Sequence, residues 1–184
     1  MAKKPKNAYV APTVLRPFNK NDQSLLQVVI ETPKGSRNKY KFDPKLGGFK
    51  LSKTLPAGMD FPYDFGFVPS TQADDGDPID VLLLMDESAF SGCIIDARLV
   101  GVIEGEQQED GSAVRNDRLI AVAEANHMYS EIQDVSDLSP KLRKELEEFF
   151  INYHKLDGKK FKVLGCKGPK DAEKLLRKAM KHAA

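Results

Sequence analysis

The stretch Asp74-Asp-Gly-Asp-Pro-Ile-Asp80, followed at once by Val81-Leu-Leu-Leu-Met85, is the most informative part of the chain. Gly76 permits a tight turn and Pro78 fixes its own φ, so the acidic part is predicted to form a compact loop. The run after the loop is almost wholly apolar, which predicts a strand buried on both faces. The carboxylate that ends the loop, Asp80, is therefore expected at the rim of the core.

Carboxylates that lie this close together are costly without a cation. Two of them within about 4 Å repel by roughly 1 kcal/mol in water, and by about 4 kcal/mol at an effective dielectric of 20. A divalent cation removes this cost, and oxygen-only ligands suit Mg²⁺, Mn²⁺ or Ca²⁺ rather than zinc. The spacing does not match an EF-hand loop, and a Walker A motif is absent from the sequence. Taken alone, the segment also fits a surface turn rich in Asp.

On either side of this stretch, the sequence predicts strands first and helices second. Apolar and β-branched runs separated by turn residues predict short strands. They cover residues 25–31, 40–42, 48–53, 79–85, 93–104 and 118–123, with one more at 160–164. Ser139 is a good N-cap with Pro140 after it, and apolar residues at helical spacing follow until Asp157-Gly158. A last amphipathic helix begins near Pro169. This order predicts an α+β fold, mainly β, as a closed or partly closed barrel with helices packed outside.

Length and composition are those of a single globular domain. The chain has 184 residues, 41% of them apolar and 30% charged, and we expect one domain over residues 1–184 with an extended N-terminal arm at 1–24. The net charge of +1 argues against a dedicated nucleic-acid binder. No run of about 18 apolar residues and no signal peptide is apparent, so no membrane partner is expected. Cys93 and Cys166 have no CxxC neighbour, which favours reduced thiols in a cytoplasmic protein.

Further charged residues could extend the acidic loop into a site. Glu31 ends the first predicted strand, and a hairpin-like segment at 104–110 is crowded with Glu and Asp. Cations for a phosphate group are available on several predicted strands and helices. They are Lys39, Lys53, Arg118, Lys155 and Lys167.

Together, these segments carry a family resemblance. Asp75-Gly-Asp-Pro-Ile-Asp-Val81 looks like the D-G-D-P-x-D-V signature of the soluble, magnesium-dependent, barrel-forming inorganic pyrophosphatases. Supporting stretches occur in the family's order over residues 28–167. They are Val29-Ile-Glu31, Asn38-Lys-Tyr40, Phe61-Pro-Tyr-Asp-Phe-Gly-Phe67, Val100-Gly-Val102, Arg118-Leu-Ile-Ala-Val122 and Phe149-Phe-Ile-Asn-Tyr153.

The resemblance implies hydrolysis of inorganic pyrophosphate to two phosphates on a five-stranded OB-type closed barrel. It also implies several Mg²⁺ ions, with Mn²⁺ as an alternative, and a homo-oligomer. Asp75 and Asp80 would hold the tightest metal, and Asp77 would bind metal and orient or deprotonate the attacking water. Glu31 would hold a peripheral metal, and Lys39 and Tyr153 would bind phosphate.

The sequence departs from the family pattern at several matched positions. Lys41 stands in place of a Glu, Lys53 in place of a substrate Arg, Phe61 and Phe65 in place of tyrosines, Asn116 in place of a metal Asp, Arg118 in place of a Lys and His154 in place of a Lys. We expect Asp110 or Asp117 to replace the lost metal ligand, Lys155 to replace the shifted lysine, and Lys53 and Arg118 to bind substrate. Two alternatives stay open at this point: a hydrolase of an organic or nucleotide phosphoanhydride, and a catalytically weak OB-barrel binding protein.

Overall fold

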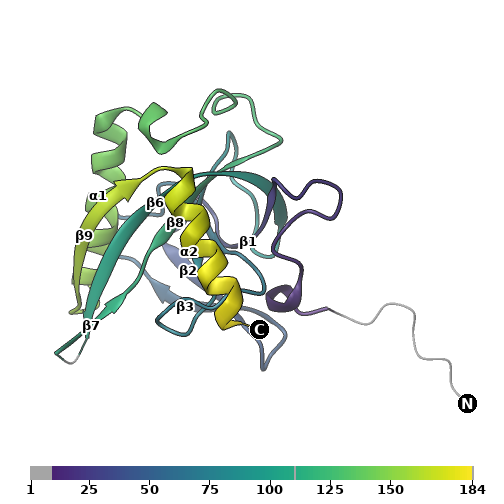
Figure 1. Ribbon diagram of the computed structural model, residues 1–184. Helices are drawn as coiled ribbons and strands as arrows, with labels where there is room; N and C mark the ends of the chain where they lie inside the picture. The colour runs from purple at the N-terminus through teal and green to yellow at the C-terminus, as the bar shows by residue number, and fades with distance from the viewer. Residues whose placement is uncertain (1–9, 110, 184) are drawn as a thin grey trace, which may run out of the picture.

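Nine strands and two α-helices make up most of the part of the chain that the structure, a computed structural model, describes: residues 10–109 and 111–183 (Figure 1). The strands are β1 (Leu26–Thr32), β2 (Asn38–Asp43), β3 (Gly48–Thr54), β4 (Asp64–Phe67), β5 (Asp80–Leu84), β6 (Ile94–Glu109), β7 (Ser112–Arg115), β8 (Arg118–Ala123) and β9 (Lys160–Lys167). The helices are α1 (Pro140–Lys155) and α2 (Pro169–His182), with short 3₁₀ turns at Pro12–Val14 and Val135–Asp137. The prediction of a mainly β, α+β fold with two helices in the C-terminal half is confirmed.

Five of the strands pair with one another in a ring. β1 pairs with β4, β4 with β5, β5 with β8, β8 with β6, and β6 returns to β1. Only the pairing of β5 with β8 is parallel among these five. The ring depends on the length of β6, whose first residues pair with β1 while its later residues pair with β7 and β9. A ring of five strands is the arrangement that an OB-type barrel requires, while closure of the barrel itself stays a prediction.

The strand after the acidic loop is buried on both faces, as its composition predicts. Along β5, Val81 and Leu83 belong to an apolar cluster that includes Leu176 of α2. Leu82 and Leu84 belong to a second cluster, which includes residues of α1. Each fully buried leucine contributes about 2 kcal/mol, so the two layers together anchor the loop that precedes β5.

The first helix begins where its capping residues predict. The Ser139 hydroxyl accepts a hydrogen bond from the Leu142 N–H at 3.2 Å, and Pro140 takes the first helical position. The turn after α1 contains Gly158 at a φ of 71°, a conformation that glycine adopts without strain. α1 therefore ends at a defined point, and the chain turns back into β9.

The β2–β3 hairpin forms a separate two-stranded sheet beside the ring. The Phe42 N–H donates to the buried Glu31 carboxylate at 2.8 Å, and the Tyr40 N–H donates to the Thr32 hydroxyl at 3.1 Å. Because both acceptors are side chains of β1, these two hydrogen bonds hold the hairpin against the ring.

Several elements differ from the sequence-based prediction. β4 and β7 were not predicted, and β6 extends to Glu109, beyond the predicted end at residue 104. In the described part of the predicted arm, the chain makes the short turn at Pro12–Val14 and an isolated bridge between Phe18 and Leu26, while residues 1–9 lie outside the described part. Within the described residues, no helix has the length and apolar character needed to cross a membrane.

Candidate active site

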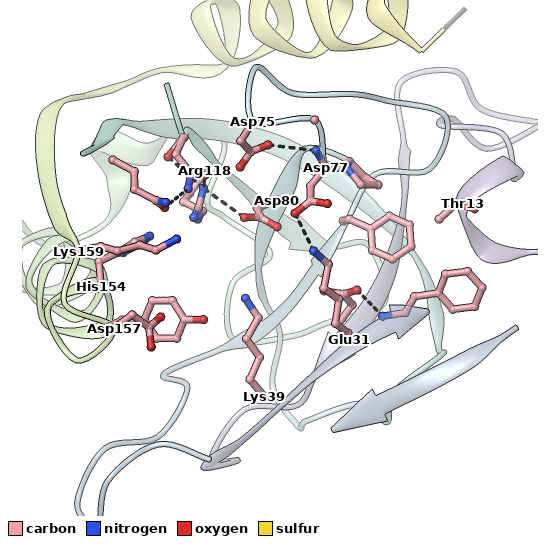
Figure 2. A pocket seen from close by; sticks show the side chains of 18 of the residues that line it. Thr13, Glu31, Lys39, Asp75, Asp77, Asp80, Arg118, His154, Asp157 and Lys159 are labelled. Atoms are coloured by element: carbon pink, nitrogen blue, oxygen red, sulfur yellow. Dashed lines mark hydrogen bonds and ion pairs between the residues drawn. The ribbon is translucent and has the colours of Figure 1, made fainter. Parts of the chain in front are cut away.

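A cavity of about 650 Å³ opens beside the start of β5 (Figure 2). The acidic loop forms one wall, the β2 strand and the end of β1 form another, and β8 and the C-terminal end of α1 complete it. The charged residues that line it are Glu31, Lys39, Lys41, Asp75, Asp77, Asp80, Arg118, Asp157 and Lys159. The cavity thus brings together charged side chains that lie up to 128 positions apart in the sequence, from Glu31 to Lys159.

The acidic loop places three of its four carboxylates in the cavity, those of Asp75, Asp77 and Asp80, while Asp74 pairs with Lys178. The Asp77 N–H donates to the Asp75 carboxylate at 3.2 Å, and Gly76 adopts a φ of 89° between them. Burial raises the pKa of Asp75, and the nearby charge of Asp80 raises it further. Since like charges oppose each other here, a divalent cation would relieve the repulsion, and oxygen-only donors suit Mg²⁺.

Cationic side chains contact two of these carboxylates. The Lys41 Nζ lies 2.7 Å from an Asp77 oxygen, and the Arg118 guanidinium lies 3.1 Å from an Asp80 oxygen. Over residues 10–109 and 111–183, no three Asp, Glu, His or Cys side chains come together in a geometry that would hold one metal ion. By their chemistry these oxygen donors suit magnesium, while the Asp77 and Asp80 carboxylates contact Lys41 and Arg118.

Glu31 is the most deeply buried acid of the cavity, with 6% of its surface exposed. Burial raises its pKa to about 7, although the hydrogen bond from the Phe42 N–H opposes the shift. The negative charge of Asp80 adds to the increase. Glu31 is therefore partly protonated near neutral pH unless a cation binds next to it.

Two further cations line the cavity, the half-buried Lys39 and the buried Arg118. Lys39 lies over the Phe65 and Tyr153 rings, 5.3 Å from each centroid. Burial acts to lower the pKa of Lys39, but Tyr153 and Asp80 outweigh it and the pKa is raised, so Lys39 stays charged. Arg118 is 5% exposed and donates to the backbone carbonyls of Asn116 and Asp117 at 3.0 and 3.1 Å.

A pair of cations beside a carboxylate loop is an arrangement suited to phosphate held through divalent cations. The model of the family described as inorganic pyrophosphatase matches residues 28–184. The chain belongs to this family.

Relatives of known sequence and structure agree with the family match. The chain is 39% identical over 143 residues to the inorganic pyrophosphatase of Synechocystis, which covers 78% of this chain and 82% of that protein. It is 36% identical over 160 residues to the inorganic pyrophosphatase of Thermus thermophilus, covering 87% of this chain and 89% of that protein. The crystal structure of an inorganic pyrophosphatase from Thermus thermophilus superposes with a TM-score of 0.86 at 33% identity, covering 95% of this chain and 99% of that one.

Among the residues predicted from the family resemblance, Asp75, Asp77, Asp80, Glu31, Lys39, Arg118 and Tyr153 all line the cavity. Three other predicted site residues that the structure describes lie outside the cavity lining: Lys53, Lys155 and Asp117. Lys53 pairs with Asp157 and lies 3.8 Å from the centroid of the Tyr153 ring, outside the cavity lining. Lys155 lines a separate surface hollow at the end of α1.

The predicted replacement ligands for the altered metal position are not found in the cavity lining of the described residues. The Asp117 carboxylate accepts from the Gly105 N–H at 3.0 Å and lies 2.7 Å from the Arg115 guanidinium. It lines a small hollow near α2 instead. Asp110 lies outside the described residues. Asn116 lines the cavity, where its side-chain amide donates to Gln107 at 2.9 Å.

Sequence reasoning missed Lys159 of the cavity and identified His154 only as a departure from the family pattern. The Gly158 turn brings Lys159 back beside the end of α1, where its N–H donates to the His154 carbonyl at 3.1 Å. His154 is 3% exposed, its ring stacks on Phe161 at 4.5 Å, and its Nδ1 lies 2.8 Å from the Phe150 carbonyl. The Asp157-Gly158 turn was the signal that could have pointed to Lys159 rather than Lys155.

Proposed function

We propose that this chain hydrolyses inorganic pyrophosphate to two phosphates, using Mg²⁺ held by the carboxylates of the acidic loop. One observation carries the proposal: three loop carboxylates share one cavity with the half-buried Lys39 and the buried Arg118, in a member of the inorganic pyrophosphatase family. Pyrophosphate is densely negative, and its hydrolysis requires positioning and neutralisation of charge more than covalent help. A carboxylate wall would repel such a substrate unless divalent cations lay between the two.

The acidic loop supplies the proposed metal and water chemistry. Asp75 and Asp80 hold the tightest Mg²⁺, and Glu31 holds a peripheral ion. Bound Mg²⁺ supplies neutralisation of the phosphate charge and a stronger water nucleophile. Asp77 orients the water or takes its proton as the water oxygen bonds to one phosphorus atom. The bond from that phosphorus to the bridging oxygen then breaks, and the second phosphate leaves.

The cationic side of the cavity holds the phosphate groups. Lys39 and Arg118 bind phosphate oxygens, and the Tyr153 hydroxyl adds a hydrogen bond. Lys159 is the candidate for the role first expected of Lys155, because it lines the cavity. Lys53 contributes indirectly, through its contact with the Tyr153 ring.

Several expectations extend this proposal. Mn²⁺ is expected to support the same chemistry, because it shares the oxygen ligands that Mg²⁺ prefers. The family resemblance supports a homo-oligomer, and the composition supports a cytoplasmic protein without a nucleic-acid partner. Asp110 and Asp117 stay candidates for a further metal ion, although the contacts of Asp117 with Arg115 and Gly105 favour a structural role.

Phosphate release from pyrophosphate, with and without Mg²⁺, tests the proposal beside ATP, ADP-ribose and tripolyphosphate. We expect turnover on the order of 1 s⁻¹ or faster on pyrophosphate, lost with EDTA. Preference for another anhydride would support a retuned substrate site, and absence of turnover on every substrate would support the binding-protein alternative. The match to the family over residues 28–184 does not favour either alternative.

A further inference from the structure

Within the described residues, Lys41 of the β2–β3 hairpin forms an ion pair with a carboxylate of the acidic loop, that of Asp77. It lies two positions after Lys39 on β2, and both side chains line the cavity. The Lys41 Nζ donates to the Asp77 carboxylate at 2.7 Å, from a residue 36 positions away in the sequence. Figure 2 shows the dashed line of this contact beside Asp77. The two side chains are 48% and 55% exposed, so the pair is accessible to ions from solvent.

The charges that line the cavity nearly balance before any metal ion is added. Five acids (Glu31, Asp75, Asp77, Asp80 and Asp157) face four bases (Lys39, Lys41, Arg118 and Lys159). Without Lys41, the described lining would carry a net charge of −2 instead of −1. The Lys41 ammonium thus places a positive charge beside Asp77, the carboxylate that would orient or deprotonate the attacking water in the proposed reaction.

A divalent ion that approaches Asp77 meets two obstacles. It must displace or share the oxygen that Lys41 contacts, and it is repelled by the ammonium charge. An ammonium group has no acceptor and cannot coordinate a metal, so Lys41 opposes binding rather than assisting it. Because the lysine is part of the chain, this effect is present at every concentration of free metal.

We propose that the Lys41 ammonium occupies one cation position among the carboxylates of Asp75, Asp77 and Asp80. These carboxylates therefore hold one divalent ion fewer than they would bind without Lys41. This inference rests on the proposed function, in which the same carboxylates hold Mg²⁺. Lys41 is thereby a residue that sets the number of metal ions in the site. Through this contact with Asp77, the hairpin limits metal binding at the acidic loop.

Counting bound Mn²⁺ by electron paramagnetic resonance, without substrate, tests the inference independently of turnover. The variants are Lys41→Gln, which removes the charge, and Lys41→Glu, which adds an oxygen donor at the same position. Lys45→Gln is the matched control, because Lys45 is an exposed lysine in the turn of the same hairpin. We expect Lys41→Gln to bind its weakest ion about tenfold more tightly, and Lys41→Glu to bind one more ion per chain than the parent protein.

The outcomes separate this inference from the proposed function. If the parent protein binds Mn²⁺ and hydrolyses pyrophosphate, but both Lys41 variants bind the same number of ions with the same affinity, the inference is wrong and the function stands. The same holds if Lys45→Gln tightens binding as much as Lys41→Gln does. If the parent protein neither binds Mn²⁺ nor hydrolyses pyrophosphate, the proposed function and the inference are both wrong.

Discussion

Replacement of His154 with Gln should make the fold less sensitive to acid. The pKa of His154 is lowered from 6.5 to about 4, mainly by burial and also by the positive charges of Arg118, Lys39 and Lys53, against the hydrogen bond with the Phe150 carbonyl. The native state therefore holds His154 neutral over a pH range in which the unfolded chain binds a proton. Stability that depends on the neutral ring is present above about pH 6.5 and is lost as the pH falls toward 4.

The magnitude follows from the two pKa values. With 6.5 for the unfolded chain and about 4 for the native state, protonation of the unfolded chain lowers the free energy of unfolding by about 2 kcal/mol between pH 7.5 and pH 5. Gln does not titrate, and its amide N–H can donate to the same Phe150 carbonyl. The variant should lose about 0.5–1.5 kcal/mol at every pH, since the ring stack on Phe161 disappears.

Equilibrium unfolding in urea at pH 5, 6 and 7.5 measures this difference. EDTA should be present throughout, so that metal binding does not add its own pH dependence, and the protein concentration should be constant because assembly would affect stability. The parent protein should lose about 2 kcal/mol more than His154→Gln between pH 7.5 and pH 5. His127→Gln, in an exposed loop, controls for the loss of a histidine from the surface. Equal losses in the parent and His154→Gln, within about 0.5 kcal/mol, would refute the reasoning.

Three further predictions concern the loop and the sheet. Asp80→Asn should lower Mg²⁺-dependent turnover on pyrophosphate by about 100-fold or more while circular dichroism shows the native fold; full activity in the folded variant would contradict the assigned role. Asp117→Asn should lower the free energy of unfolding by about 1–3 kcal/mol, because it weakens buried contacts, and should reduce Mn²⁺ affinity no more than Asn116→Ala does; a larger reduction, measured by calorimetry, would restore Asp117 as a metal ligand. Gly66→Ala should destabilise the chain by at least about 3 kcal/mol, since a Cβ there would lie 2.0 Å from the Val29 carbonyl oxygen; a urea midpoint like that of the parent would show that the strands separate more easily than their packing indicates.

The residues that sequence alone located correctly are those whose neighbours in the chain determine their surroundings. The apolar run from Val81 predicted a strand buried on both faces, because every side chain in it needs an apolar partner. Ser139 and Pro140 predicted the start of α1, because capping acts within one helical turn. The acidic loop and its compactness followed in the same way from Gly76 and Pro78.

The elements that sequence alone missed depend on distant contacts. β4 is only four residues long and contains Asp64 and Gly66, so it has little strand character by itself. It is a strand because β1 and β5 pair with its two edges, and because Gly66 lets the Val29 backbone approach. β7 likewise exists only as the partner of the far end of β6.

The sequence by itself determined the family, the mainly β fold and the carboxylate loop, because these depend on residue type and on spacing within short segments. Only the tertiary structure decided which of several neighbouring charged side chains enter the cavity. Arg118 enters it while the adjacent Asp117 pairs with Arg115, and Lys159 enters it while Lys155 lines another hollow. The contact of Lys41 with Asp77 was likewise decided only by the tertiary structure. The direction of a side chain at the end of a strand or helix depends on the elements packed against it, and those elements come from distant parts of the chain.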